Sequence, residues 1–352
     1  MKGRHIILDR IGGRDAAALM VDGQLQDLII APDDAIGFAP GAVLRGRADR
    51  LMKGQGGVFV RLPGGATGYL RDRAGIAEGK PLLVQVAGVA ESGKAIPLTS
   101  RLVLKGRYGI VTPGVTGVNV SRRLRDPDLR DALTEQGAAL IGNRPIGLIL
   151  RSAAAEADAQ DIADDLAPLI ALSERLDADR AGEPELLVDA PAPWDQAWTE
   201  WAEPAPDQVD DAEGSFDDLG VTEAIAALLA PVVPLPGGAN AVIEPTRALV
   251  AIDLNTGADT TPAAGLKANI ALARDLPRQL RLRGLGGQIV VDFAPMPKRD
   301  RAVLDQVLRA AFKGESAETT LIGWTAMGLY ELSRKRDRAP LARLAAHLDG
   351  GR

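Results

Sequence analysis

The sequence contains no cysteine and only two histidines, His5 and His347. The absence of cysteine excludes disulfides and thiolate metal sites. Two histidines near opposite ends of the chain disfavour histidine-dependent triads and imidazole zinc centres. No apolar run reaches the roughly 18 residues of a membrane-spanning helix, and the start MKGRHIILDR lacks a signal-peptide pattern. We therefore expect a cytoplasmic protein without zinc; if it is an enzyme, carboxylates, lysines, arginines and a hard metal carry the chemistry.

The net charge of -6 is distributed unevenly along the 352 residues. Residues 153–220 contain 20 Asp and Glu against two Arg, which leaves 39 basic and 27 acidic residues elsewhere. Residues 91–125 hold seven Lys or Arg and one Glu. Such a patch attracts a phosphate backbone, although an ordinary solvated face has the same composition.

Turn-forming residues divide the chain into five segments. Residues 1–34 contain strand-like stretches, and residues 35–100 alternate short apolar runs with glycine-rich turns, a pattern typical of an OB-type β-barrel, a fold that binds single-stranded nucleic acid. Residues 101–180 predict an α+β unit with a long amphipathic helix. The acidic, proline-rich residues 181–220 predict a linker or partly ordered surface segment. Residues 221–352 alternate strands with helices and end in a helix, so the fold class combines α/β and α+β parts.

Two strand-like runs in the last segment end on an aspartate. VAIDLNTGAD carries Asp253 and GGQIVVDFAPM carries Asp292. Carboxylates at neighbouring strand ends are the ligands that Mg²⁺ or Mn²⁺ prefers, and Asn255 points to the same side as Asp253. An aspartate followed by Asn, Thr or Gly is also typical of an Asx turn or a helix cap, and each stretch alone leaves that alternative open.

Several residues are candidates for contacts with RNA. Phe59 and Tyr69 are possible stacking residues of the barrel, with a place in the barrel core as the alternative. Lys298, Arg299 and the run SRKRDR (333–338) are candidates for neutralising phosphates, with a solvated helix end as the alternative for the run.

Taken in order, these stretches resemble the ribonuclease E/G family. NAVIEPTRALVAIDLNTG followed by ANIALARDLPRQLRLRGLGGQIVVDFAPM is similar to the family's catalytic signature, and GLYELSRKR resembles its closing helix. GGVFVRLPGGATGYL is similar to its RNA-binding barrel, GVNVSRRL to the stretch after that barrel, and GLILRSAA to its 5′-phosphate sensor.

The resemblance implies a DNase I-like catalytic subdomain over residues 221–352. In it, Asp253 and Asp292 would hold Mg²⁺, with Mn²⁺ as a possible substitute, and Asn255 would assist.

The resemblance also implies RNA-binding roles upstream. Arg151 and Ser152 would sense a 5′-monophosphate within the 101–180 unit, Ser152 standing where the family usually has threonine. Single-stranded RNA would contact the barrel positions Phe59, Tyr69 and Lys94 and the arginines Arg122 and Arg123.

Departures from the family pattern qualify the resemblance. Relatives commonly share a zinc ion between two subunits through a Cys-x-x-Cys motif, so a chain without cysteine excludes a zinc-linked dimer and leaves a homodimer without that link open. We expect no degradosome scaffold tail. Residues 1–34 and 181–220 stand where relatives have a ribonuclease H-like subdomain, which we expect to be reduced. DFAPM lacks the family's acid before methionine.

The leading hypothesis is a metal-dependent endoribonuclease that cuts single-stranded RNA to 5′-phosphate and 3′-hydroxyl ends and is stimulated by a 5′-monophosphate. One rival is a relative with weak or no catalysis that binds RNA in an rRNA or ribosome context. Another is a protein that binds partners through its acidic segment. The set Asp253, Asn255 and Asp292 favours the enzyme, because carboxylates repel phosphates when no metal is bound.

Overall fold

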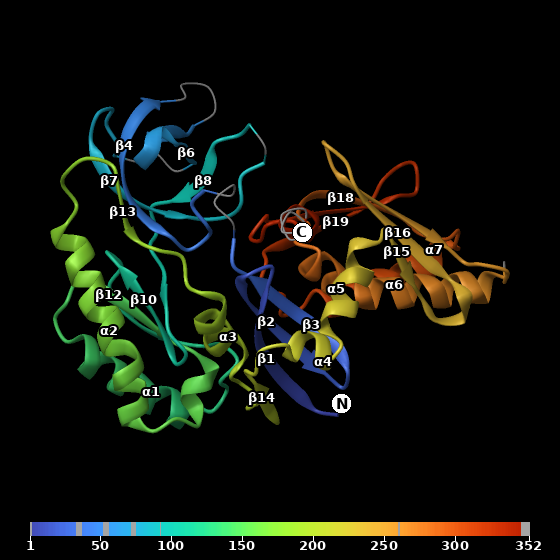
Figure 1. Ribbon diagram of the computed structural model, residues 1–352, viewed down its shortest axis with the longest axis horizontal. Helices are drawn as coiled ribbons and strands as arrows, with labels where there is room; N and C mark the ends of the chain where they lie inside the picture. Colours follow the sequence, from blue (N-terminus) through green and yellow to red (C-terminus); the bar gives the residue numbers. More distant parts are fainter. Residues whose placement is uncertain are drawn as a thin grey trace. The chain divides into compact units, whose positions relative to one another are not determined.

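The computed structural model describes residues 2–32, 37–51, 56–71, 75–91, 93–259 and 261–345. The chain forms two compact units (Figure 1). The terminal unit combines Met1–Asp33 with Val209–Arg352, and the inserted unit is Asp34–Gln208. Among the described residues, no helix is both long enough and apolar enough to cross a membrane.

The inserted unit begins with a closed β-barrel. Its strands are β4 (Val43–Leu51), β5 (Val58–Arg61), β6 (Thr67–Leu70), β7 (Pro81–Val86) and β8 (Ile96–Thr99). They pair in the order β4-β5-β6-β8-β7, and β7 pairs back to β4, which closes the sheet. Alternate residues point inward, so Val58, Val60 and Leu70 lie in the barrel core. This five-stranded barrel is consistent with the expected OB-type fold.

A mixed sheet covered by two helices follows the barrel. Its strands, in spatial order, are β11 (Gly117–Val120), β12 (Ile146–Leu150), β10 (Gly109–Pro113) and β9 (Leu104–Lys105). Helix α1 (Pro127–Ile141) begins at Asp126, whose carboxylate accepts from the backbone N–H of Asp128 and Leu129. Helix α2 (Ala159–Ala178) buries Ile162, Leu166 and Ile170, the apolar face that its periodicity predicts.

The acidic segment 181–220 differs from the expected linker, because the structure gives it four regular elements. They are β13 (Glu185–Val188), α3 (Pro193–Trp201), β14 (Gln208–Asp210) and α4 (Ser215–Asp218). Strand β13 pairs with β4, and α3 buries Ala197 and Trp201. Acids of this segment form ion pairs with cations of the barrel and of the mixed sheet, so its charge does not keep it unfolded.

The terminal unit contains a small sheet in the order β14-β1-β2-β3, in which β1, β2 and β3 are antiparallel. Strands β1 (Arg4–Ile11), β2 (Arg14–Val21) and β3 (Gln24–Ile30) are joined by tight turns. The β2–β3 turn is Asp22-Gly23, both with positive φ (49° and 78°), as a type I′ hairpin requires. In the sequence, the Asp-Gly pair between two apolar runs is the signal for this hairpin.

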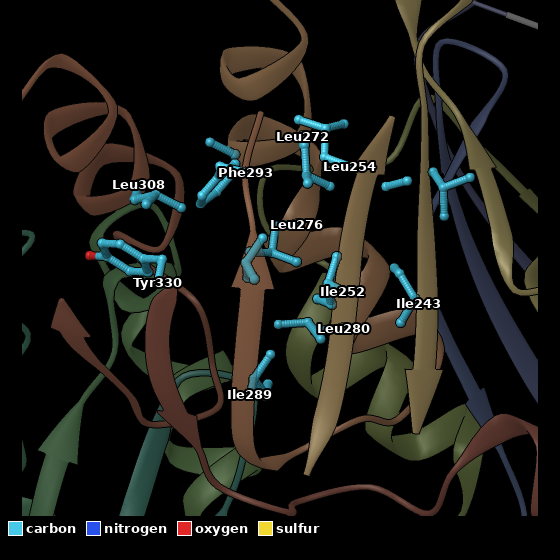
Figure 2. Packing of buried hydrophobic residues seen from close by; sticks show 14 of the residues in the cluster. Ile243, Ile252, Leu254, Leu272, Leu276, Leu280, Ile289, Phe293, Leu308 and Tyr330 are labelled. Carbon is cyan, nitrogen blue, oxygen red and sulfur yellow. The ribbon is translucent and has the colours of Figure 1, made fainter. Parts of the chain in front are cut away.

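A six-stranded sheet forms the rest of the terminal unit. Its strands, in spatial order, are β15 (Val232–Pro234), β16 (Asn240–Pro245), β17 (Val250–Asn255), β18 (Gly287–Asp292), β20 (Tyr330–Arg334) and β19 (Thr319–Trp324). Only β17 and β18 are parallel, and helix α6 (Pro262–Leu282) connects them. Figure 2 shows the core between this sheet and the helices, where Ile252, Ile289 and Leu276 pack together. The remaining helices are α5 (Val221–Leu229), α7 (Lys298–Ala311) and α8 (Leu341–Ala345).

GLYELSRKR does not form the closing helix that the resemblance suggested. Its central residues form strand β20, which pairs with β18 and β19. Tyr330, Leu332 and Arg334 are buried, whereas Glu331 and Ser333 between them are more exposed. This alternation has the period of a strand, so the local pattern contradicts a helix.

Buried ion pairs join the small sheet to the C-terminal part of the terminal unit. Asp27 on β3 pairs with Arg338, and Arg281 of α6 donates to the carbonyl of Gln26 at 2.8 Å. Burial raises the pKa of Asp27, but the charge of Arg338, its hydrogen bond, Arg281 and the N–H of Leu28 together hold that pKa below its ordinary value.

Candidate functional site

Asp253 and Asp292 lie side by side on adjacent parallel strands, Asp292 at the end of β18 and Asp253 two residues before the end of β17. The register of β17 and β18 makes these two residues direct partners. Their neighbours Ile252 and Val291 point into the core, so alternation places both carboxylates on the opposite, exposed face of the sheet. The structure thus brings together the two acids that the sequence singled out.

Asn255 extends this pair along β17. Its side-chain amide donates to Oδ2 of Asp253 at 3.1 Å. The chain then turns at Gly257, which has φ of 72° and whose hypothetical Cβ would lie 2.5 Å from the carbonyl oxygen of Gly238. Glycine therefore fits this turn for two reasons, positive φ and close backbone contact.

The donor set fits a hard cation that keeps much of its water shell. Two exposed carboxylates on adjacent strands, one of them oriented by an amide, suit Mg²⁺ or Mn²⁺, since these ions need only one or two protein carboxylates. The described ranges contain no group of three or more His, Asp or Glu side chains placed so that they could hold a metal ion. The site therefore does not resemble an all-protein metal cage.

Sequence analysis missed a residue that fixes the backbone after Asp292. Asn269 of α6 is fully buried. Its amide donates to the carbonyl of Ala294 at 3.0 Å, and its carbonyl accepts from the N–H of Ala294 at 2.9 Å. A lone asparagine on the apolar face of a helix was the available signal, because a buried amide needs partners.

The basic run SRKRDR is partly a structural element. Arg334 is buried and pairs with Glu315 at 3.0 Å, and Arg338 pairs with Asp27. These two arginines are therefore not available to bind RNA phosphates, which corrects the sequence-based expectation for them. Lys298 and Arg299 occupy the exposed first turn of α7, which follows β18.

Phe59 and Tyr69 form an aromatic pair on the outer surface of the barrel. They are register partners on β5 and β6, with ring centroids 5.6 Å apart. Both are half-buried and alternate with core residues, which argues against the barrel-core alternative. The guanidinium of Arg50, which sequence analysis missed, lies 5.4 Å from the Phe59 ring centre. Gly57 leaves room for Tyr69, because a Cβ there would lie 2.3 Å from its hydroxyl.

Lys94 lies in the turn between β7 and β8. Its ammonium group pairs with Glu91 at 2.7 Å, and its side chain is 67% exposed. Lys94 precedes β8, and β8 pairs with β6, the strand that carries Tyr69.

The segments that carry Arg122–Arg123 and Arg151–Ser152 leave the mixed sheet at the same end of two neighbouring strands. Strands β11 and β12 are parallel, with Val120 opposite Leu150. Arg122 and Arg123 follow β11, and Arg151 and Ser152 follow β12, so both pairs leave the sheet at the same end. Ligands bind at such strand ends in many α/β sheets.

Arg130 supports the turn that carries Arg122 and Arg123. Its Nη1 donates to the carbonyl oxygens of Ser121 at 2.8 Å and Leu124 at 3.1 Å. Both arginines in the turn are exposed. Sequence analysis did not select Arg130, since nothing in the sequence distinguishes an arginine that binds carbonyls from one that binds a ligand.

Arg151 is held by the chain itself. Its Nη1 donates to the carbonyl oxygens of Gly106 at 2.9 Å and Thr199 at 2.7 Å. Its Nη2 donates to Glu200 at 3.2 Å, and Glu200 also pairs with Lys105 at 2.9 Å. Burial raises the pKa of Glu200, but Lys105 and Arg151 together hold that pKa below its ordinary value.

Comparison with known proteins identifies the family. The sequence model of the ribonuclease E/G family matches residues 103–209 and 186–337. The chain belongs to the ribonuclease E/G family. The ribonuclease E/G match includes Arg151 and Asp253 with their neighbours, whereas the barrel residues Phe59 and Tyr69 precede it.

Individual members of the family align over most of the chain. It is 28% identical to ribonuclease E of Nostoc sp. over 375 residues, which cover 91% of this chain and 54% of that protein. It is 28% identical to ribonuclease G of Salmonella typhimurium over 380 residues, covering 90% of this chain and 76% of that protein. Ribonuclease G of Escherichia coli K12 is 27% identical with the same coverage. The chain thus spans about half of one relative and three quarters of the others.

Proposed function

We propose that the protein is a metal-dependent endoribonuclease that hydrolyses single-stranded RNA to 5′-phosphate and 3′-hydroxyl ends. The observation that carries the proposal is the register pairing of Asp253 with Asp292, within a chain of the ribonuclease E/G family. A protein that only bound RNA would gain nothing from two exposed carboxylates there, because they repel phosphates. The six-stranded sheet with α6 and α7 would then be a DNase I-like catalytic subdomain.

Asp253 and Asp292 would hold the metal, which we propose to be Mg²⁺, with Mn²⁺ as a substitute. The chemistry that a bound Mg²⁺ supplies is polarisation of the phosphodiester and a lowered pKa for the attacking water. Asn255 would orient the Asp253 carboxylate through the hydrogen bond from its amide. Asn269 would fix the direction in which the chain leaves Asp292.

The inserted unit would bind the RNA. Phe59 and Tyr69 offer exposed ring surfaces for stacking of bases, with Arg50 adding positive charge and Lys94 a further cation. Arg151 and Ser152 would sense a 5′-terminal monophosphate, with the exposed Arg122 and Arg123 at the same end of the neighbouring strand. Binding of a 5′-monophosphate at these strand ends would favour cleavage of the transcripts that carry one.

The proposal also covers the small sheet, the acidic segment and the oligomeric state. The small sheet and the acidic segment would correspond to a reduced ribonuclease H-like subdomain, and a homodimer would form without a zinc link. The acidic segment is not a free partner-binding surface over its whole length, since Glu200, Glu203 and Glu185 pair within the inserted unit.

The test is cleavage of a short single-stranded RNA labelled at its 3′ end, carrying a 5′-monophosphate or a 5′-hydroxyl, with Mg²⁺ or with EDTA. Wild type is compared with Asp253→Asn and Asp292→Asn, and with Glu244→Gln as a matched control on the neighbouring strand β16. We expect Mg²⁺-dependent cutting that both aspartate variants lose and the control retains. Tight binding by wild type without any cutting would instead establish the RNA-binding alternative.

A further inference from the structure

The guanidinium of Arg151 has two kinds of partner. Backbone carbonyls of Gly106 and Thr199 accept from Nη1, and these two contacts involve no side-chain atom of Glu200. Thr199 lies in the last turn of α3, whose free carbonyls attract a cation. The third partner, the Glu200 carboxylate, is therefore not needed to hold Arg151 in place.

Glu200 lies between two cations and partly faces solvent. Its carboxylate is 2.9 Å from Nζ of Lys105 and 3.2 Å from Nη2 of Arg151. The side chains of Glu200, Arg151 and Lys105 are 26%, 23% and 52% exposed, so an incoming anion can reach all three. A carboxylate on two cations occupies the position that a phosphate would take.

We propose that Glu200 determines specificity as an internal competitor: its carboxylate occupies the Lys105–Arg151 anion site and yields only to a phosphate monoester dianion. This inference rests on the proposed role of Arg151 as a 5′-phosphate sensor. A terminal phosphate carries nearly two negative charges at neutral pH, whereas an internal phosphodiester carries one, the same as Glu200. The dianion matches the two cations, and a monoanion gains nothing over the carboxylate that it displaces.

Displacement requires only a side-chain rotation. Helix α3 is anchored by Ala197 and Trp201, which are 0% and 4% exposed. Arg151 keeps both carbonyl partners when Glu200 moves away. The site is thus ready to receive the phosphate without rearrangement of the backbone.

The test is equilibrium binding measured by fluorescence anisotropy in EDTA, where no metal-dependent cleavage interferes. One RNA is used with three 5′ ends: a monophosphate, its methyl ester and a hydroxyl. The methyl ester keeps the terminal phosphorus but carries one charge fewer and one additional methyl group, as an internal phosphodiester carries a second ester substituent. The variants are Glu200→Gln and Lys105→Gln, with Glu203→Gln as the matched control, because Glu203 is a similarly exposed acid that pairs with Arg107 instead.

Wild type is expected to prefer the monophosphate about tenfold over the other two ends, which bind alike. Glu200→Gln should bind the methyl ester about tenfold more tightly than wild type does, which reduces the discrimination between the two phosphates. Lys105→Gln should lose affinity for the monophosphate, and Glu203→Gln should behave as wild type. Thermal unfolding of each variant verifies folding.

Two results would overturn the inference. If Glu200→Gln weakens monophosphate binding, Glu200 positions the site rather than competing for it. If wild type binds all three ends equally, the sensor itself is absent and the competitor has no role. Neither result bears on the nuclease assignment, since cleavage by Asp253 and Asp292 is measured separately with Mg²⁺.

Discussion

Asn255 donates a hydrogen bond to the carboxylate of Asp253 from two residues further along the same strand. Both side chains lie on the exposed face of the sheet, so the amide restricts the Asp253 carboxylate without help from the core.

We expect Asn255→Ala to raise the Mg²⁺ concentration for half-maximal cleavage by about tenfold or more, because loss of a residue that orients a metal ligand typically has this effect. The measurement is an Mg²⁺ titration of the cleavage rate. Ser333→Ala, a change on the exposed side of β20, serves as the control and should leave the titration unchanged. An unchanged midpoint in Asn255→Ala would remove this role from Asn255.

Asn269→Ala should destabilise the protein by roughly 2 to 5 kcal/mol, because it leaves the N–H and the carbonyl of Ala294 buried without their partner. Chemical denaturation with circular dichroism measures the loss. Cleavage by the folded variant should also fall, since the chain after Asp292 is no longer fixed. Asn255→Ala, at an exposed position, is the control for stability and should stay within about 0.5 kcal/mol of wild type. Equal stability of the two variants would contradict the stabilising role of the hydrogen bonds between Asn269 and Ala294.

Phe59→Ala and Tyr69→Ala should each weaken binding of single-stranded RNA by about 1 to 3 kcal/mol, the usual contribution of one stacked base. The two losses should not be additive, because the rings contact each other at 5.6 Å between centroids. Anisotropy titrations of both single variants and the double variant measure the coupling, and Phe59→Tyr should retain most of the affinity. Full additivity would mean that the rings act on separate bases.

Asp27→Asn should lower the free energy of unfolding at pH 7 by about 3 to 5 kcal/mol, because Arg338 loses its buried partner. The pKa of Asp27 is lowered in the folded state. Its stabilisation is therefore complete above the unfolded pKa of about 3.9 and is lost as the pH falls through the lower folded value.

The measurement is the difference in unfolding free energy between wild type and Asp27→Asn from pH 7 to pH 2. That difference should stay constant down to about pH 4 and shrink below it. Asp15→Asn removes an exposed pair with Arg10 and should change stability by less than about 1 kcal/mol. A difference that grows on acidification would contradict a lowered pKa of Asp27 in the folded state.

Local sequence patterns predicted the parts of the fold that depend on alternation and turns. The barrel followed from short alternating runs, and α2 from an apolar face every third or fourth residue. The positions of Asp253 and Asp292 were visible because an apolar run is followed by an acid there, although strand β17 continues past Asp253 to Asn255. The error at GLYELSRKR arose where resemblance was preferred to the alternation of Tyr330 and Leu332.

Ion pairs between residues far apart in the chain could not be predicted from local sequence patterns. Nothing near Glu200 indicates that it meets Lys105 and Arg151, which lie 95 and 49 residues earlier. Composition alone therefore assigned the acidic segment to a linker. Likewise, Arg334 and Arg338 were predicted to lie on a basic surface, because the acids that pair with them, Glu315 and Asp27, lie elsewhere in the chain.

The terminal unit is assembled from both ends of the chain, on either side of the inserted unit. During synthesis, β1 to β3 emerge before the inserted unit, yet Arg338, a partner of Asp27, is 311 residues further on. The inserted unit is complete before Arg338 leaves the ribosome, so it is free to fold before the ion pair between Asp27 and Arg338 can form. A chain that stops before residue 338 would lack the Asp27–Arg338 ion pair, so the full stability of this sheet depends on synthesis through residue 338.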